Sequence, residues 1–199
     1  MRVLGALVGV LLAAGCAAAA PQAAEPTPTP SAVADLIVAP EGRRAGYDRS
    51  LFDEGVDADG DGCHTRCEVL ERQRRADLPG LAGGGWLSSY DGYTTDDAGE
   101  LEVDHVVALA EAWDSGASTW TAELRAAFAN DLDTPELLAV TAATNRSKGD
   151  RDPAEWQPPS RASWCDFGAA WVAVKVHWGL TADRAEVDAL TNLLRDCPT

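Results

Sequence analysis

VDHVV at residues 103–107 and TNRSKGD at residues 144–150 are the two stretches that decide the fold of this chain. The first stretch lies in a segment, residues 101–108, whose apolar and polar side chains alternate, as is typical of a strand. A second short apolar run follows at residues 137–142. We therefore expect two strands, with the second stretch beginning a helix directly after them.

The side chains of these stretches suit a single catalytic site. Neighbouring residues of a strand point to opposite faces, so Asp104 and His105 can share a site only at a strand end, with the helix bringing Asn145 against it. Carboxylate and amide oxygens are ligands of hard divalent ions, and an imidazole titrating near neutrality can act as a general base. Each stretch alone is better explained by a surface pair or a helix cap. Together they predict metal-assisted hydrolysis of phosphodiester bonds.

Length and composition indicate one domain. The chain has 199 residues, of which 46% are hydrophobic and seven are Trp, which is enough for a sizeable core. Helical segments are expected at residues 65–77, 119–129, 162–177 and 181–196, and no internal repeat is visible. We therefore expect a mostly helical α+β domain over residues 41–199.

The N-terminus predicts export. Residues 1–24 combine an early Arg, an apolar run too short to span a bilayer and several small residues, as in a signal peptide. The string LAAGC at residues 12–16 also resembles a lipobox, in which Cys16 would be lipidated. Residues 25–40 are rich in Pro and Thr and are expected to form an extended linker. The protein would be extracellular, either freely secreted or lipid-anchored to the outer face of the cell membrane.

The cysteine pattern also indicates export. The sequence has five cysteines, of which Cys16 belongs to the leader, and the others suit two disulfides in an oxidising compartment. Zinc binding through Cys63, His64 and Cys67 is the alternative, but a second half-site is missing.

The pairing of the cysteines follows from the two C-terminal helices. A glycine break separates residues 162–177 from residues 181–196. In an antiparallel hairpin the start of the first helix meets the end of the second, which places Cys165 beside Cys197. The remaining two cysteines are then left to pair with each other, Cys63 with Cys67.

A second acidic set lies upstream, at residues 57–68. It fits the calcium-loop pattern D-x-[DN]-x-[DN]-G-x5-E. Its ligands would be Asp57, Asp59, Asp61 and Glu68. The residues before it make a poor helix, so the segment is either a structural Ca²⁺ site or an acidic turn held by a disulfide.

The charge of the chain counts against a general nucleic-acid binder. The formal net charge is −16, whereas non-specific affinity for nucleic acid comes mainly from Lys and Arg. The cations gather in the N-terminal third of the chain and around residues 146–151. A local basic wall at the site would therefore give weak, salt-sensitive binding without much sequence preference.

The two opening stretches together resemble the HNH nucleases. In these proteins a ββα-metal core of the His-Me finger type carries an Asp-His pair on the first strand and an Asn on the helix. Further stretches between residues 101 and 159 are similar to exported actinobacterial HNH endonuclease family proteins. Those are related to the C-terminal nuclease domain of modification-dependent restriction enzymes. The resemblance extends over residues 46–197.

The resemblance implies a role for each site residue. Asp104 and Asn145 would bind one Mg²⁺ or Mn²⁺ ion, and His105 would be the general base that deprotonates the attacking water. The substrate phosphate would be contacted by Arg146 and Lys148. From across the site, Arg66 would either reach the phosphate or only pair with acidic neighbours.

One position departs from the family pattern. HNH proteins often carry an Asn just before the second strand, which supports the loop around the catalytic His. The corresponding residue here is Glu136, and Asn130 lies upstream as an alternative. The sequence alone assigns this role to neither.

The expected function is that of a secreted, metal-dependent HNH endonuclease, a hydrolase acting on DNA or also on RNA, with no protein partner evident. Two alternatives remain. One is a calcium-binding cell-surface module built on residues 57–68. The other is an HNH-like lipoprotein that has lost catalysis.

Overall fold

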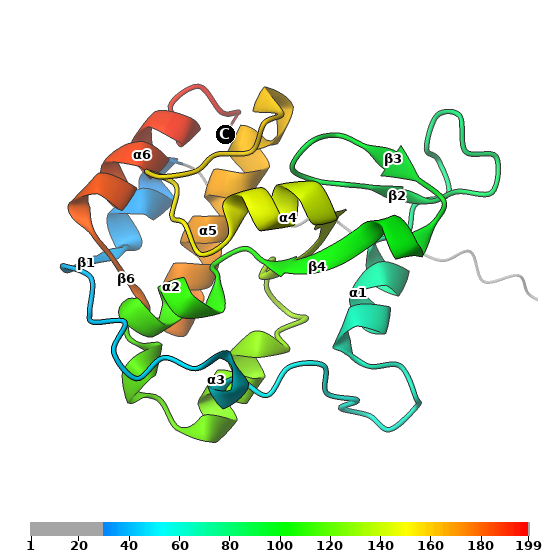
Figure 1. Ribbon diagram of the computed structural model, residues 1–199. Helices are drawn as coiled ribbons and strands as arrows, with labels where there is room; N and C mark the ends of the chain where they lie inside the picture. The colour runs from blue at the N-terminus through cyan, green and yellow to red at the C-terminus, as the bar shows by residue number, and fades with distance from the viewer. Residues whose placement is uncertain (1–29, 199) are drawn as a thin grey trace, which may run out of the picture.

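The computed structural model describes residues 30–198, and Figure 1 shows how its elements are arranged. The predicted signal segment, with Cys16 and its lipobox, lies outside the described residues. The helices are α1 (Thr65–Gln73), α2 (Leu109–Asp114), α3 (Ala122–Ala129), α4 (Ala142–Lys148), α5 (Trp164–Trp178) and α6 (Arg184–Leu194). The strands are β1 (Ile37–Val38), β2 (Trp86–Leu87), β3 (Thr94–Thr95), β4 (Leu101–His105), β5 (Leu137–Thr141) and β6 (Thr181–Ala182). Among residues 30–198, no helix has both the length and the apolar character needed to cross a membrane.

The predicted ββα unit is present at β4, β5 and α4. The two strands pair in antiparallel orientation, with Leu101 opposite Thr141 and His105 opposite Leu137. Thr141 ends β5 and also caps α4, because its hydroxyl accepts a hydrogen bond from the N–H of Thr144. The helix therefore begins without a loop and lies against the strand pair (Figure 1).

Helix α5 lies at the centre of the core. Its apolar residues face neighbours on all sides, and Trp171 and Val174 are fully buried. Gly179 ends the helix in the left-handed conformation, with φ of 65°, and the chain returns as α6. The disulfide between Cys165 and Cys197, with Cα atoms 5.6 Å apart, joins the two ends of this hairpin. The predicted α+β domain with a C-terminal helical hairpin is thus confirmed.

The start of α6 differs from the prediction. Residues 181–196 are expected from the sequence to be helical, but Thr181 lies in β6, which pairs in parallel with β1. Asp183 caps the helix instead, in a capping box with Glu186. A carboxylate at Asp183 satisfies the first free N–H groups, so the two preceding residues are available for strand pairing.

Part of the predicted extended linker, residues 30–40, is folded onto the domain in the structure. Residues 30–40 include a 3-10 helix, Pro30–Asp35, and strand β1. Val33 and Leu36 lie in the main core cluster, where they are 9% and 6% exposed. These apolar side chains pack this part of the segment onto the C-terminal hairpin, so the domain begins earlier than residue 41.

A buried ion-pair cluster joins the central helices. Nζ of Lys175 lies 2.8 Å from Oε1 of Glu111 and 2.7 Å from Oε1 of Glu186. All three side chains are at most 3% exposed, so each charge depends on the others for compensation. The cluster therefore fixes α2, α5 and α6 relative to one another.

Helix α1 covers the free edge of β5. It ends at Gln73, earlier than expected, because Arg75 leaves the helix to pair with the backbone of Gly85. The Gln73 side chain donates to the Leu137 carbonyl at 2.7 Å and accepts from the Ala139 N–H at 2.9 Å. One amide side chain thus satisfies a donor and an acceptor of the strand.

Candidate active site

A cavity of about 300 Å³ lies at the end of β4. Asp104, His105 and Asn145 all line it. Asp104 and His105 point to opposite faces of β4, but the strand ends at His105, so both side chains can border the same cavity. The structure therefore brings together the three residues that the sequence singled out, from β4 and from α4.

Asp104 is held by two donors in the interior. The Tyr90 hydroxyl donates to its Oδ2 at 2.7 Å, and Nζ of Lys148 lies 3.0 Å from the same oxygen. Lys148 also donates to the backbone carbonyl of His105 at 2.7 Å. Burial raises the pKa of Asp104 above its usual value, while the ammonium of Lys148 and the Tyr90 hydroxyl act to lower it. The carboxylate is thus fixed in position and partly neutralised.

The His105 ring is buried and is held by a backbone contact. Its Nε2 lies 2.9 Å from the backbone carbonyl of Ala129, at the end of α3. A carbonyl only accepts hydrogen bonds, so this contact assigns the proton to Nε2 and leaves the Nδ1 lone pair unprotonated. Burial lowers the pKa of His105 to about 4, so the ring is neutral at pH 7. The ring also stacks on Phe128, with centroids 6.5 Å apart.

Asn145 contributes an amide oxygen. Its Nδ2 donates to Oε2 of Glu102 at 2.9 Å, so the amide oxygen is not the atom engaged in this bond. That oxygen and the Asp104 carboxylate are both hard oxygen donors, and both residues line the same cavity. This donor set fits a Mg²⁺ or Mn²⁺ ion, with water or phosphate oxygens completing the shell.

The three cations expected to contact phosphate differ in their surroundings. Arg146 is 71% exposed and lies 3.6 Å from Glu102. Lys148 is fully buried, so contact with a phosphate would require it to leave Asp104. Arg66 donates to the backbone carbonyls of Ala98 and Leu101, both at 3.0 Å. It lines a second cavity, of about 350 Å³, that also borders His105 and Asn145.

Glu136 supports the loop after His105. Its backbone carbonyl accepts from the N–H of Val106 at 2.7 Å, and its side chain accepts from the N–H of Val107 at 3.1 Å. The residue is fully buried, and its Oε1 has no hydrogen-bond partner among the described residues. Burial raises the pKa of Glu136 well above its usual value. The supporting contact, left unassigned from the sequence, is therefore made at the Glu136 position.

Asn130 has a different role. Its Oδ1 accepts from the N–H groups of Gly55 and Val56, at 2.9 and 3.1 Å. Its Nδ2 donates to the carbonyl of Asp53 at 2.6 Å. Asn130 thus ties residues 53–56 to the end of α3.

Two arginines of the cavity wall were not singled out as site residues from the sequence. Arg44 and Arg49 line the 300 Å³ cavity with Asp104 and His105. Both lie in the irregular segment between β1 and α1, which carries no periodic pattern. Their clustering with other N-terminal cations was the only sequence signal for their presence at the site.

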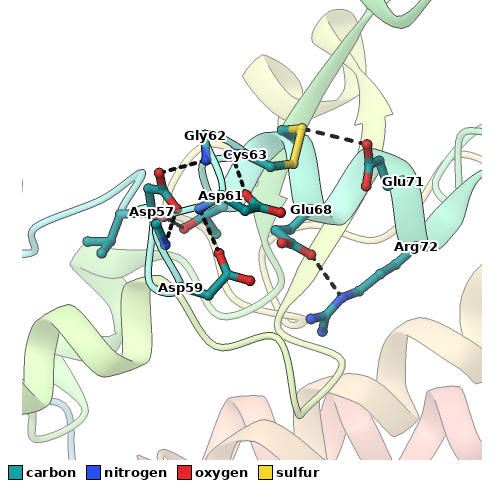
Figure 2. Close-up of a disulfide and its surroundings, with 12 residues drawn as sticks. Asp57, Asp59, Asp61, Gly62, Cys63, Glu68, Glu71 and Arg72 are labelled. Atoms are coloured by element: carbon teal, nitrogen blue, oxygen red, sulfur yellow. Dashed lines mark hydrogen bonds and ion pairs between the residues drawn. A yellow bond between two sulfur atoms is a disulfide. The ribbon is translucent and has the colours of Figure 1, made fainter.

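The predicted calcium segment brings three of its four acids together (Figure 2). One carboxylate oxygen from each of Asp57, Asp59 and Asp61 lies within 4.8 Å of the others. Several of these oxygens already accept backbone N–H bonds within the loop. Glu68 groups with Asp61 and lies 3.5 Å from Arg72. Calcium binding by this segment remains a prediction.

The disulfide beside this segment excludes the zinc alternative. Cys63 and Cys67 are bonded to each other, with Cα atoms 5.3 Å apart (Figure 2). Oxidised sulfurs cannot act as thiolate ligands. Both predicted disulfides are therefore present in the structure.

Comparisons with known proteins show the family of the chain. The family model described as GmrSD restriction endonucleases, C-terminal domain, matches residues 81–193, which include β4, β5 and α4. An uncharacterized secreted protein of Arthroderma benhamiae is 39% identical over 186 residues, covering 86% of this chain and 91% of that protein. No solved structure matches the chain.

Proposed function

The chain belongs to the family of GmrSD restriction endonuclease C-terminal domains, and from this membership we propose that it is a secreted, metal-dependent HNH endonuclease that hydrolyses phosphodiester bonds in DNA. The observation that carries the proposal is the single cavity lined by Asp104, His105 and Asn145. Nuclease chemistry with one metal ion needs a base, a carboxylate and a further oxygen donor close together, and this cavity offers all three.

His105 is the proposed general base. Its Nδ1 would take a proton from the attacking water, while the Nε2 proton stays bonded to the carbonyl of Ala129. This bond fixes the ring orientation and stabilises the positive charge that develops on the imidazole. Burial lowers the pKa of His105 to about 4, below the near-neutral value expected from the sequence, so the ring is neutral at pH 7 but is a weaker proton acceptor than a free imidazole.

Asp104 and Asn145 are the proposed metal ligands. When bound, a divalent ion would stabilise the charge that develops on the phosphate and on the leaving oxygen. Lys148 would hold the Asp104 carboxylate against α4, so that it keeps a fixed place relative to Asn145. Arg146, which is largely exposed on α4, is available for the substrate phosphate.

Export of the protein is part of the proposal. The relative from Arthroderma benhamiae is described as secreted, and the two disulfides of this chain suit an oxidising compartment. The predicted signal segment also supports export. It allows two outcomes, free secretion of the protein or lipidation at Cys16. Mass spectrometry of the mature N-terminus distinguishes them, because lipidation would make Cys16 the first residue and add the mass of the acyl chains.

The activity can be tested with plasmid DNA and RNA, each incubated with Mg²⁺, Mn²⁺, Ca²⁺ or a chelator. We expect cleavage with Mg²⁺ or Mn²⁺, and loss of cleavage with the chelator. His105→Ala should lower the rate about 100-fold or more. Asp104→Asn should lower it through loss of the metal ligand.

The matched control is His177→Ala, which removes an exposed imidazole from the last turn of α5. This variant should cleave at the wild-type rate. Cleavage that is absent under every condition, or that is equal in His105→Ala and His177→Ala, would contradict the proposal.

A further inference from the structure

Three arginines line the two cavities that border His105, and their guanidinium groups are engaged in different ways. Arg44 binds Asp114 at 2.6 Å and Asp150 at 2.5 Å, so it joins two acidic residues. Arg66 donates to two backbone carbonyls. Both groups are therefore committed to holding the fold.

Arg49 is the exception among these arginines. Its side chain is 63% exposed, and Glu54 is the partner with which it makes side-chain hydrogen bonds in the described part of the chain. The bonds are paired: Nε donates to Oε1 at 2.7 Å and Nη2 to Oε2 at 2.6 Å. Arg49 lines the cavity with Asp104, and Glu54 lines the neighbouring cavity, so their ion pair lies where the two cavities adjoin at His105.

The backbone on both sides of this ion pair is fixed. The side chain of Asp48 accepts from the N–H of Ser50 and caps the 3-10 turn that begins at Arg49. Phe52 is buried in the core with 1% exposure. The Asn130 side chain binds the carbonyl of residue 53 and the N–H of residue 55, directly on either side of Glu54. The backbone that carries Arg49 and Glu54 is thus held in place beside the cavity.

We propose that Arg49 binds a backbone phosphate of the nucleic-acid substrate, and that Glu54 holds its guanidinium at the cavity until that phosphate takes the place of the carboxylate. The inference rests on the proposed function and adds a substrate-binding residue to it. A phosphodiester presents two oxygens to a guanidinium in the same forked arrangement as a carboxylate. Exchange of one anion for the other therefore needs little movement of Arg49.

The presence of Glu54 has a cost for binding. An incoming phosphate must displace a carboxylate that is already bonded, so substrate affinity is lower than Arg49 alone would give. Because an exposed ion pair is weak, the exchange remains accessible. The arrangement is consistent with the weak, salt-sensitive binding expected from the acidic composition of the chain.

Binding is tested separately from cleavage, by fluorescence anisotropy in a chelator with a short labelled DNA duplex and, in parallel, a single-stranded RNA. Arg49→Ala should weaken binding about tenfold and lower the slope of log affinity against log salt by about 1, as for one lost phosphate contact. Arg184→Ala on α6 is the matched control, since it removes an exposed arginine from the hairpin and should change neither quantity.

Glu54→Gln should tighten binding about threefold in the wild-type background. In the Arg49→Ala background it should have no effect, because the carboxylate then has no guanidinium to release. Asp53→Asn makes the same charge change one residue away, and any tightening that it shares with Glu54→Gln is a general effect of charge.

The inference is overturned if Arg49→Ala and Arg184→Ala bind alike, or if Glu54→Gln tightens binding equally with and without Arg49. It is supported if the Arg49 variants alone bind more weakly and with a lower salt dependence than wild type. These measurements contain no metal and involve no hydrolysis, so a nuclease that cleaves but binds without Arg49 retains the proposed function and loses only this inference.

Discussion

Nζ of Lys148 lies 3.0 Å from Oδ2 of Asp104, and the two side chains are 0% and 6% exposed. This ion pair joins β4 to α4, the two elements that supply the proposed metal ligands. A buried charge without its partner is strongly destabilising, so the site and the core depend on the same contact.

Lys148→Met should lower the free energy of unfolding by about 3–5 kcal/mol, because it leaves the Asp104 carboxylate buried without a cation. Urea denaturation followed by tryptophan fluorescence measures the change. The double variant with Asp104→Asn should recover much of the loss, since it removes the orphaned charge. Arg146→Met, an exposed change two residues away, should stay within about 0.5 kcal/mol of wild type. Equal stability of the two single variants would contradict the structural role of Lys148.

The buried His105 should make stability depend on pH. In the unfolded chain this imidazole takes up a proton below about pH 6.5, whereas burial lowers its pKa in the folded protein to about 4. The unfolded state therefore binds more protons at His105 between these values, and the contribution of this residue to folding stability should fall by about 3 kcal/mol as pH drops from 6.5 to 4. The measurement compares denaturation of the metal-free protein and of His105→Gln, which should lack this component of the loss. His177→Gln should keep it, and an identical pH profile for the two variants would refute the assignment.

Glu136 should give the opposite dependence. Burial raises the pKa of Glu136 well above its usual value, so the folded protein keeps a proton that the unfolded chain loses near pH 4.5. Stability should therefore decrease as pH rises above 4.5, by at most about 1.4 kcal/mol per pH unit from this residue. Glu136→Gln keeps an acceptor for the Val107 N–H without an ionisable proton, so its stability should increasingly exceed that of wild type as pH rises.

The same position should affect catalysis through the loop after His105. Glu136→Ala removes the acceptor of the Val107 N–H and should cost about 1–3 kcal/mol of stability. Its cleavage rate should fall, while Glu136→Gln retains most of the activity. Equal rates for the Ala and Gln variants would mean that the loop does not need this hydrogen bond.

The two disulfides should contribute unequally to the free energy of unfolding. Cys165 and Cys197 are separated by 32 residues, whereas Cys63 and Cys67 are separated by 4. In the chain-entropy model, removing the disulfide that closes the longer loop lowers the free energy of unfolding by about 4 kcal/mol, and removing the one that closes the shorter loop lowers it by about 2 kcal/mol. Pairwise Cys→Ser variants, compared by thermal unfolding, measure this order. A larger loss at the shorter loop would mean that this bond has a further role in shaping the segment of residues 57–68.

The predicted calcium segment can be tested by ligand-dependent stability. If Ca²⁺ binds only the folded protein, the melting temperature should rise with Ca²⁺ concentration in wild type. The rise should be absent in a variant carrying Asp57→Asn and Asp59→Asn. Asp188→Asn, an exposed acid on α6, is the matched control and should keep it. A wild-type melting temperature that does not respond to Ca²⁺ would contradict the prediction.

The sequence predicted those parts of the fold that depend on neighbouring residues. Alternation at β4 and β5 and the glycine after α5 are local signals, and they led to the ββα unit and the helical hairpin. Pairing of the cysteines followed from that hairpin. The identity of Asp104, His105 and Asn145 as a set came from the same local order of strands and helix.

The remaining features depend on contacts between distant segments. Pairing of β1 with β6 is specified by no pattern in either strand, and the burial of Val33 and Leu36 appears only once the hairpin exists. The carbonyl of Ala129 that orients His105 is a backbone group, which no residue type can signal. Lys148 was expected at the substrate, but its long side chain reaches inward to a charge 44 residues away in sequence. Such pairings follow from the assembled fold.

The amide of Gln73 has a consequence beyond stability. A two-stranded sheet has exposed edges, and an unpaired edge is a template on which a strand from another molecule can add. By bonding to Leu137 and Ala139, this side chain occupies the hydrogen-bonding positions that an incoming strand would use. The helix thereby protects β5 from self-association, and the protein can carry a short, apolar strand next to its proposed active site without becoming a seed for aggregation.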